Sequence, residues 1–139
     1  MNPQSEVQRI EAKLNKLFAG EPRDFRPFAV FDESLDCIRV VTRDCSVTET
    51  RVNELLTILE DNYPDRPEAK YVGFTIKGAR HFCLERQLKA AGPIRLAEIL
   101  DEILAAFPQP FVDVCVNAVA RPILEQNPQI DIVELPTAA

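Results

Sequence analysis

The sequence contains little glycine, a single histidine and no tryptophan: four Gly, one His and no Trp occur among 139 residues. Because the chain has only four glycines, it has no glycine-rich loop of the kind that holds a phosphate group. No run of about 18 consecutive apolar residues occurs, so we expect no membrane-spanning helix. The first residues lack the basic start and apolar core of a secretory signal, which favours a cytoplasmic protein.

Basic residues are outnumbered as well, with 16 Lys and Arg against 22 Asp and Glu and a formal net charge of −6. An acidic chain has no general attraction for polyanions, so we expect neither nucleic acid nor a membrane surface as a partner. The segment 66–95 is the exception, because most of its charged residues are basic. Its basic patch, formed by Lys77, Arg80, Arg86 and Lys89, could receive an acidic protein partner or complement acidic helices of the same chain or of a dimer mate.

The four cysteines match neither a compact disulfide framework nor a metal motif, since no Cys-x-x-Cys occurs. We therefore expect reduced thiols that behave as small apolar residues, and no cofactor. The weaker alternative is a zinc site, because sulfur and imidazole nitrogen are ligands that Zn²⁺ prefers. Its ligands would be Cys37, His81, Cys83 and Cys115.

The spacing of apolar residues predicts a single α+β domain. Capping-box patterns at Ser5 and Ser46 mark the starts of two of the expected helices, and Gly92-Pro93 opens the strongest one. Helices are expected at residues 4–18, 47–61, 93–107 and 119–126. Strands are expected at residues 28–32, 36–42, 70–76, 80–86, 111–117 and 130–134, with a helix over 82–91 as the competing interpretation of the fourth.

From residue 36 onward the predicted elements follow the order βαββαβ, which is that of a ferredoxin-like two-layer sandwich. A second interpretation is a pair of ββα units, since residues 54–64 resemble residues 98–108. Both interpretations give a mostly antiparallel sheet with its helices on one face. The sandwich would span residues 28–135, after a helical N-terminal extension over 1–20 and before a disordered tail over 136–139.

If helices cover one face of this sheet, alternation along the strands assigns the remaining side chains to an open face. This set mixes aromatic, polar and thiol groups, a composition typical of an interface or a ligand-binding face. The candidate binding residues on it are Arg39, Tyr71, Thr75, His81, Cys83, Phe111, Asp113 and Asn117.

The leading hypothesis is a non-catalytic interaction module that self-associates through this open face as a homodimer, anchored by Val41, Tyr71 and Phe111. The alternative is a small enzyme or ligand-binding protein. Its site would consist of Arg39, His81, Cys83 and Asp113, with the imidazole as general base beside a thiol. No catalytic motif supports that alternative, and the sequence leaves the ligand unnamed.

Overall fold

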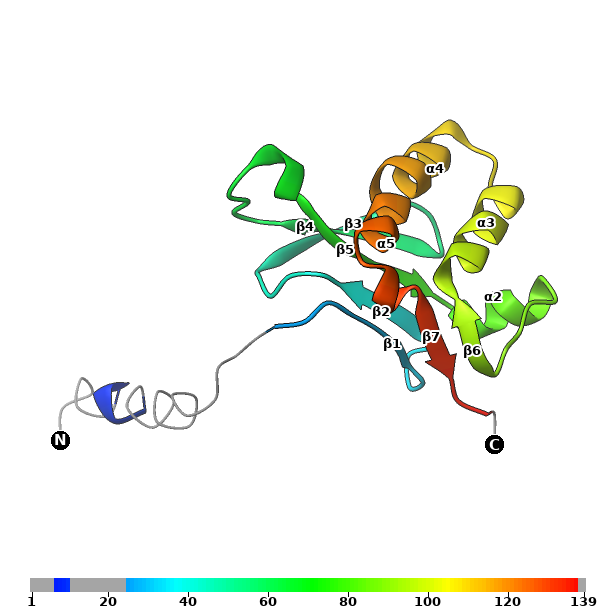
Figure 1. Cartoon of the computed structure of the whole chain (residues 1–139), viewed down its shortest axis with the longest axis horizontal. Helices are drawn as coiled ribbons and strands as arrows, with labels where there is room; N and C mark the ends of the chain where they lie inside the picture. Colours follow the sequence, from blue (N-terminus) through cyan, green and yellow to red (C-terminus); the bar gives the residue numbers. More distant parts are fainter. Residues whose placement is uncertain (1–6, 11–24, 138–139) are drawn as a thin grey trace.

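A computed structural model describes residues 7–10 and 25–137 of the chain. Its main feature is a five-stranded antiparallel sheet in the spatial order β1-β2-β5-β4-β3 (Figure 1). The strands are β1 (Phe28–Asp32), β2 (Cys37–Val41), β3 (Val47–Arg51), β4 (Leu56–Asp61) and β5 (Tyr71–Lys77). Thus β5, the last strand of this sheet in sequence, lies between two pairs of strands that precede it.

The sheet is followed by a mainly helical segment. The short 3-10 turn η1 (Pro67–Ala69) lies just before β5. The segment after β5 contains α2 (Ala79–Glu85), β6 (Gly92–Arg95), α3 (Leu96–Ala106), α4 (Pro110–Cys115), the π-helical turn η2 (Val116–Ala120), α5 (Arg121–Gln126), η3 (Pro128–Ile130) and β7 (Ile132–Leu135). Strands β6 and β7 pair antiparallel in a separate two-stranded sheet. Helices α3, α4 and α5 all lie on one side of the larger sheet in Figure 1.

The hydrophobic core lies between the sheet and these helices. Cross-strand pairing aligns Ile38 and Leu56 with Ile76, and aligns Val40 and Ile58 with Phe74, so all of these residues share one face. They are almost inaccessible to solvent and join one apolar cluster with the inner sides of α3 and α5. Burial of this face drives the packing of the helices against the sheet.

The first turns of two helices donate backbone hydrogen bonds to carboxylates from distant segments of the chain. Asp36, in the β1–β2 turn, accepts hydrogen bonds from the backbone N–H groups of Arg80 (2.7 Å) and His81 (3.3 Å) in the first turn of α2. Asp131 accepts one from the N–H of Ala97 (3.0 Å) in α3. Neither helix has a capping side chain at its own N-cap residue. The starts of both helices therefore depend on tertiary contacts.

The prediction of a helix over 47–61 is wrong, because this segment forms the β3–β4 hairpin. The side-chain oxygen of Asn53 accepts hydrogen bonds from the N–H groups of Leu55 (2.9 Å) and Leu56 (2.7 Å), which fixes the turn. The apolar spacing of Val52, Leu55, Leu56 and Leu59 resembles a helical stripe, but the strands gain long-range pairing that an isolated helix would lack. Residues 54–64 contain strand β4 and residues 98–108 contain most of helix α3, so the sequence similarity between them does not correspond to a structural repeat.

The predicted strand over 111–117 is also wrong, since this segment lies in α4 and η2. Pro110 occupies the first helical turn, a position that tolerates its missing N–H group. The buried side chains Val112, Cys115 and Val116 follow helical spacing, whereas the alternation of polar residues between them suggested a strand. Residues 80–86 are not a strand either, because α2 covers Ala79–Glu85; the competing helix over 82–91 overlaps only part of it.

Because of these corrections, the βαββαβ order of a ferredoxin-like sandwich is not observed. The α+β class and the antiparallel sheet are confirmed, and the helices α3, α4 and α5 lie on one side of that sheet. The predicted strands at 28–32, 36–42, 70–76 and 130–134 correspond to β1, β2, β5 and β7. The predicted helix at 119–126 corresponds to α5. The predicted helix at 93–107 corresponds to α3, but Gly92-Pro93 do not open it, because Gly92–Arg95 pair with β7 as strand β6 and α3 begins at Leu96. Most of the expected helix at 4–18 and residues 138–139 of the expected tail lie outside the described residues; residues 7–10 are helical.

Candidate functional site

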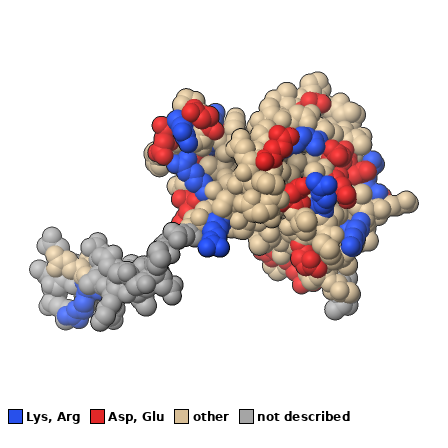
Figure 2. Space-filling model, viewed as in Figure 1, with Lys and Arg blue, Asp and Glu red and all other residues tan. Residues whose placement is uncertain are grey.

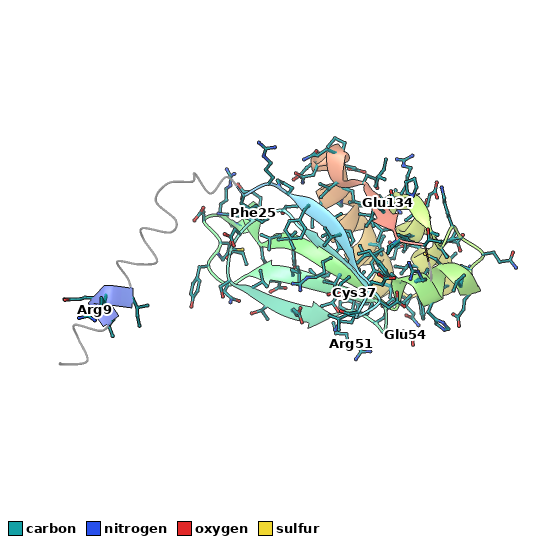
Figure 3. All side chains as sticks on the ribbon, turned by 90° about the horizontal axis from the view of Figure 1, so that it is seen from below. Arg9, Phe25, Cys37, Arg51, Glu54 and Glu134 are labelled. Carbon is teal, nitrogen blue, oxygen red and sulfur yellow. The ribbon has the colours of Figure 1, made fainter. Side chains whose placement is uncertain are left out.

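The face of the sheet opposite the helices is the first candidate surface. Its members follow from the cross-strand register, because directly paired residues point to the same side. We call this set the open face: Phe28, Val30, Asp32, Cys37, Arg39, Val41, Glu49, Arg51, Thr57, Leu59, Gly73, Thr75 and Lys77. Figure 3 is seen from below and labels two of them, Cys37 and Arg51, at the same end of the sheet.

A row of five residues crosses the open face, one from each strand: Val30, Arg39, Thr75, Thr57 and Arg51. The two threonines at its centre are only 3% and 2% exposed, and their hydroxyl groups have no hydrogen-bond partner. The arginines beside them are exposed. Neighbouring side chains therefore close the centre of this face to solvent, and we call the exposed groups around this centre, on the inner strand β2 as well as on the outer strands, its rim.

Replacing either central threonine by valine is expected to stabilise the protein by about 1 kcal/mol, because the buried hydroxyl loses its hydration without gaining a hydrogen bond. Urea unfolding of Thr57→Val and Thr75→Val would measure this change. Thr50→Val is the matched control, since Thr50 is an exposed strand threonine whose replacement should change the unfolding free energy little. Destabilisation of both buried variants would mean that these hydroxyls bind something in solution.

The apolar part of the rim lies on β1 and β2. Phe28 is 37% and Val30 45% exposed, and both are large apolar side chains on the open face. The ring of Phe25 packs against that of Phe28 at a centroid distance of 5.8 Å and an interplanar angle of 60°. Val41, which pairs with Phe28, is half-buried. These side chains form a small apolar surface next to the closed centre of the face.

Charges of both signs accompany this apolar surface. Arg39, Arg51 and Lys77 are exposed on the open face, together with Glu49. Asp32 contributes a further negative charge, because hydrogen bonds led by that of the Ser34 hydroxyl lower the pKa of its carboxyl group. A surface with both signs of charge can complement a second copy of itself, which a surface of a single sign cannot do.

The structure brings together only part of the predicted binding face. Arg39 and Thr75 lie far apart in sequence but pair directly on the open face. Tyr71 starts β5 beyond a β-bulge, is 39% exposed, and has the ammonium group of Lys70 5.4 Å from its ring centroid. The remaining predicted residues are helical: His81 and Cys83 lie on α2, Phe111 and Asp113 on α4, and Asn117 on η2.

The alternative catalytic set is dispersed over three parts of the fold. Arg39 is on the open face, His81 and Cys83 are on α2, and Asp113 is on α4; Figure 1 shows α2 and α4 apart, with α3 between them. His81 is exposed and its Nε2 atom lies 2.9 Å from the carboxylate of Glu85. Cys83 is fully buried, and burial is the main cause that raises the pKa of its thiol to about 11. Such a thiol carries almost no thiolate near neutral pH, so it is a poor nucleophile.

A groove of about 520 Å³ lies beside α2. Its lining combines apolar side chains from α2 and from the end of α3 with charged groups of both signs. The lining residues are Glu54, Leu55, Lys77, Gly78, His81, Phe82, Glu85, Arg86, Ala106 and Phe107. The sequence pattern does not indicate that Glu54 and Phe107 line one groove, because it predicts a helix where the β3–β4 hairpin brings Glu54 next to α2.

Two of the four residues of the basic patch are engaged within the chain. Arg80 hydrogen-bonds to the carbonyl oxygens of Ala90 (3.3 Å) and Pro136, and Arg86 contacts the carboxylate of Glu102 at 3.0 Å. Lys77 and Lys89 are exposed. Figure 2 shows basic and acidic groups interspersed over the visible side of the molecule rather than a basic surface. The patch thus combines internal contacts with separate exposed lysines.

The alternative zinc site would require Cys37, His81, Cys83 and Cys115 to lie close together. All four cysteines are free thiols. In the part of the chain that the structure describes, no three side chains of His, Cys, Asp or Glu gather as a metal site requires.

The described residues also include no helix with the length and apolar character needed to cross a membrane. No family model, no curated protein and no solved structure matches the chain.

Proposed function

We propose that the chain is a non-catalytic interaction module that self-associates through the open face of its sheet. The observation that carries this proposal is the exposed apolar rim of Phe28 and Val30 on a sheet face that the helices leave uncovered. Water is removed from such side chains when an identical face packs against them around a two-fold axis. Phe28 and Val30 replace Phe111 as the proposed anchors, because Phe111 lies on α4.

A second copy is the partner that fits the charges of this face. Arg39, Arg51 and Lys77 supply positive groups, and Asp32 and Glu49 supply negative groups, on a surface that also has an apolar part. A two-fold contact juxtaposes such a surface with itself, so each charge can face its opposite. The four free thiols suit a reducing compartment, and we propose a cytoplasmic location on that ground.

The Val30→Asp variant tests this function. We expect the unmodified chain to be a dimer in solution, and we expect the variant to raise the dimer dissociation constant about a hundredfold. The reason is that each copy would place an unpaired carboxylate against an apolar surface, and a two-fold contact contains that defect twice. Native mass spectrometry and light scattering of untagged protein would measure the change.

Val114→Asp provides the matched control, because Val114 is 57% exposed but lies on α4, away from the open face. It should leave the dimer intact. Dissociation by both variants, or by neither, would count against the open face as the interface. A strictly monomeric unmodified chain at micromolar concentration would overturn self-association itself.

A further inference from the structure

The outer edge of β3 is a second surface of interest. All five residues of this strand are exposed, and β3 is the terminal strand of the sheet order. Hydrogen bonds join Val52 N–H to the Leu56 carbonyl and Asn62 N–H to the Ser46 carbonyl, so even-numbered residues direct their backbone groups toward β4. The N–H and C=O groups of Val47, Glu49 and Arg51 therefore point away from the sheet. Such an edge is a template for another strand.

The sequence of β3 restricts which strand can join this edge. Its edge carries no proline and no lysine, which are residues that commonly block edge pairing. It carries instead one negative and one positive side chain, Glu49 and Arg51, both on the open face. In an antiparallel pair, residues directly opposite each other interact most strongly, and opposite charges there are favourable. The identity of the partner strand can thus be judged from these two positions.

We propose that β3 pairs antiparallel with β3 of a second copy, around a two-fold axis that passes through Thr50. An axis at Glu49 or at Arg51 would place two like charges directly opposite each other. An axis at Thr48 would place Glu49 opposite Val47. Only the axis at Thr50 pairs Glu49 of each copy with Arg51 of the other.

This pairing goes beyond the proposed contact between open faces and is independent of it. The two-fold axis is perpendicular to the sheet, so both open faces lie on the same side of a continuous ten-stranded sheet. The backbone bonds form at the rim, where Figure 3 shows Arg51 at the end of the outermost strand. The open faces stay accessible, so the edge contact and the open-face contact use different surfaces of the chain.

Disulfide formation at Thr50 tests the register. Thr50 would face its own copy in a non-hydrogen-bonded pair, with Cα atoms about 4.5 Å apart, a separation that permits a disulfide. Thr50→Cys should therefore double the chain mass under mild oxidation. Thr48→Cys is the control: in this register the two Thr48 residues are displaced by four positions, about 13 Å along the strand, which is too far. The unmodified chain controls for its own thiols.

Charge reversal supplies the second measurement. In the Thr50→Cys chain, Glu49→Arg should lower the initial cross-linking rate roughly tenfold at low salt, because the introduced arginine would then face Arg51 of the other copy, twice in each dimer. Adding Arg51→Glu should restore the rate, since the opposite charges are exchanged and not removed. Equal or faster cross-linking at Thr48→Cys, or no rescue by the double change, would overturn the proposed register.

The Val30→Asp background separates the two proposals. If Thr50→Cys still cross-links in a chain that carries Val30→Asp, the edge contact forms without the open-face contact. If the unmodified chain is a dimer that Val30→Asp dissociates, and Thr50→Cys does not cross-link, the edge contact is wrong while the proposed function stands. If instead Thr50→Cys cross-links and Val30→Asp leaves the oligomer mass unchanged, the open-face contact is wrong while the edge contact stands.

Discussion

The Gly73→Ala variant is expected to lose about 3 kcal/mol or more of its unfolding free energy. A Cβ atom at this position would lie 2.1 Å from the carbonyl oxygen of Val40 and 3.1 Å from its carbonyl carbon. Both are backbone atoms of β2, which pairs with β5, and the Leu59 side chain lies 3.2 Å away on the other side. The clash can be relieved only by moving a central strand, which weakens the pairing around it.

Gly78→Ala is the control for this prediction. Gly78 has a φ of +64° at the N-cap of α2, but an added Cβ would meet nothing within 4 Å. Its replacement should cost about 1 kcal/mol, through backbone conformation alone. Urea unfolding would rank the unfolding free energies of the two variants, provided that the slope of free energy against urea concentration is the same in both. A smaller loss for Gly73→Ala than for Gly78→Ala would show that β2 and β5 are farther apart than described.

The Arg80→Ala variant is expected to lose about 2–3 kcal/mol of unfolding free energy, measured in the same way. The Arg80 side chain is 17% exposed and bonds to the carbonyl oxygens of Ala90 and Pro136. Its guanidinium carbon lies 5.0 Å from the centroid of the Phe31 ring. The contact with Glu33 at 3.7 Å adds little, because that carboxylate is mostly exposed. The side chain joins β1, the segment before β6 and the chain after β7.

Two further variants check this explanation. Arg80→Lys keeps the charge but loses the planar group that reaches several acceptors, so it should retain most of the destabilisation. Arg66→Ala should change stability by less than about 0.5 kcal/mol, because the Arg66 side chain is 71% exposed and its ion pair with Glu68 is long, at 3.9 Å. Full recovery in Arg80→Lys would mean that charge alone, and not the two carbonyl contacts, fixes this side chain.

The sequence predicted the strands whose composition has only one good explanation. In β1, β2 and β5, aromatic and β-branched residues are frequent over spans too short for a helix. The β3–β4 hairpin was missed because Leu55, Leu56 and Leu59 fit a helical stripe equally well, and the turn depends on a single side chain, Asn53. The same ambiguity, in the opposite direction, turned α4 into a predicted strand.

The candidate site was predicted less well than the fold class. Alternation alone predicts Arg39, Val41 and Thr75 on one side of the sheet, and the register has them on the same side, while their part in binding stays a prediction. The prediction of His81 and Cys83 on this face is wrong, because it depends on a strand over 80–86, where the structure has α2. The start of α2 depends on Asp36, far away in the sequence, and no local pattern reveals that contact. The proposed pairing of Glu49 with Arg51 of a second copy depends on β3 being an edge strand, and the sequence pattern does not predict the strand order.

The central position of β5 has a consequence for how the chain folds. The hairpins β1–β2 and β3–β4 join neighbouring segments and can form early, but they do not pair with each other in the finished sheet. Each leaves one inner edge unpaired until residues 71–77 are inserted between them. Formation of the sheet therefore waits for contacts between distant parts of the chain, which slows folding. During synthesis, a chain that has emerged only as far as the two hairpins has unpaired edges at β2 and β4, and the sheet is complete only when β5 pairs with both.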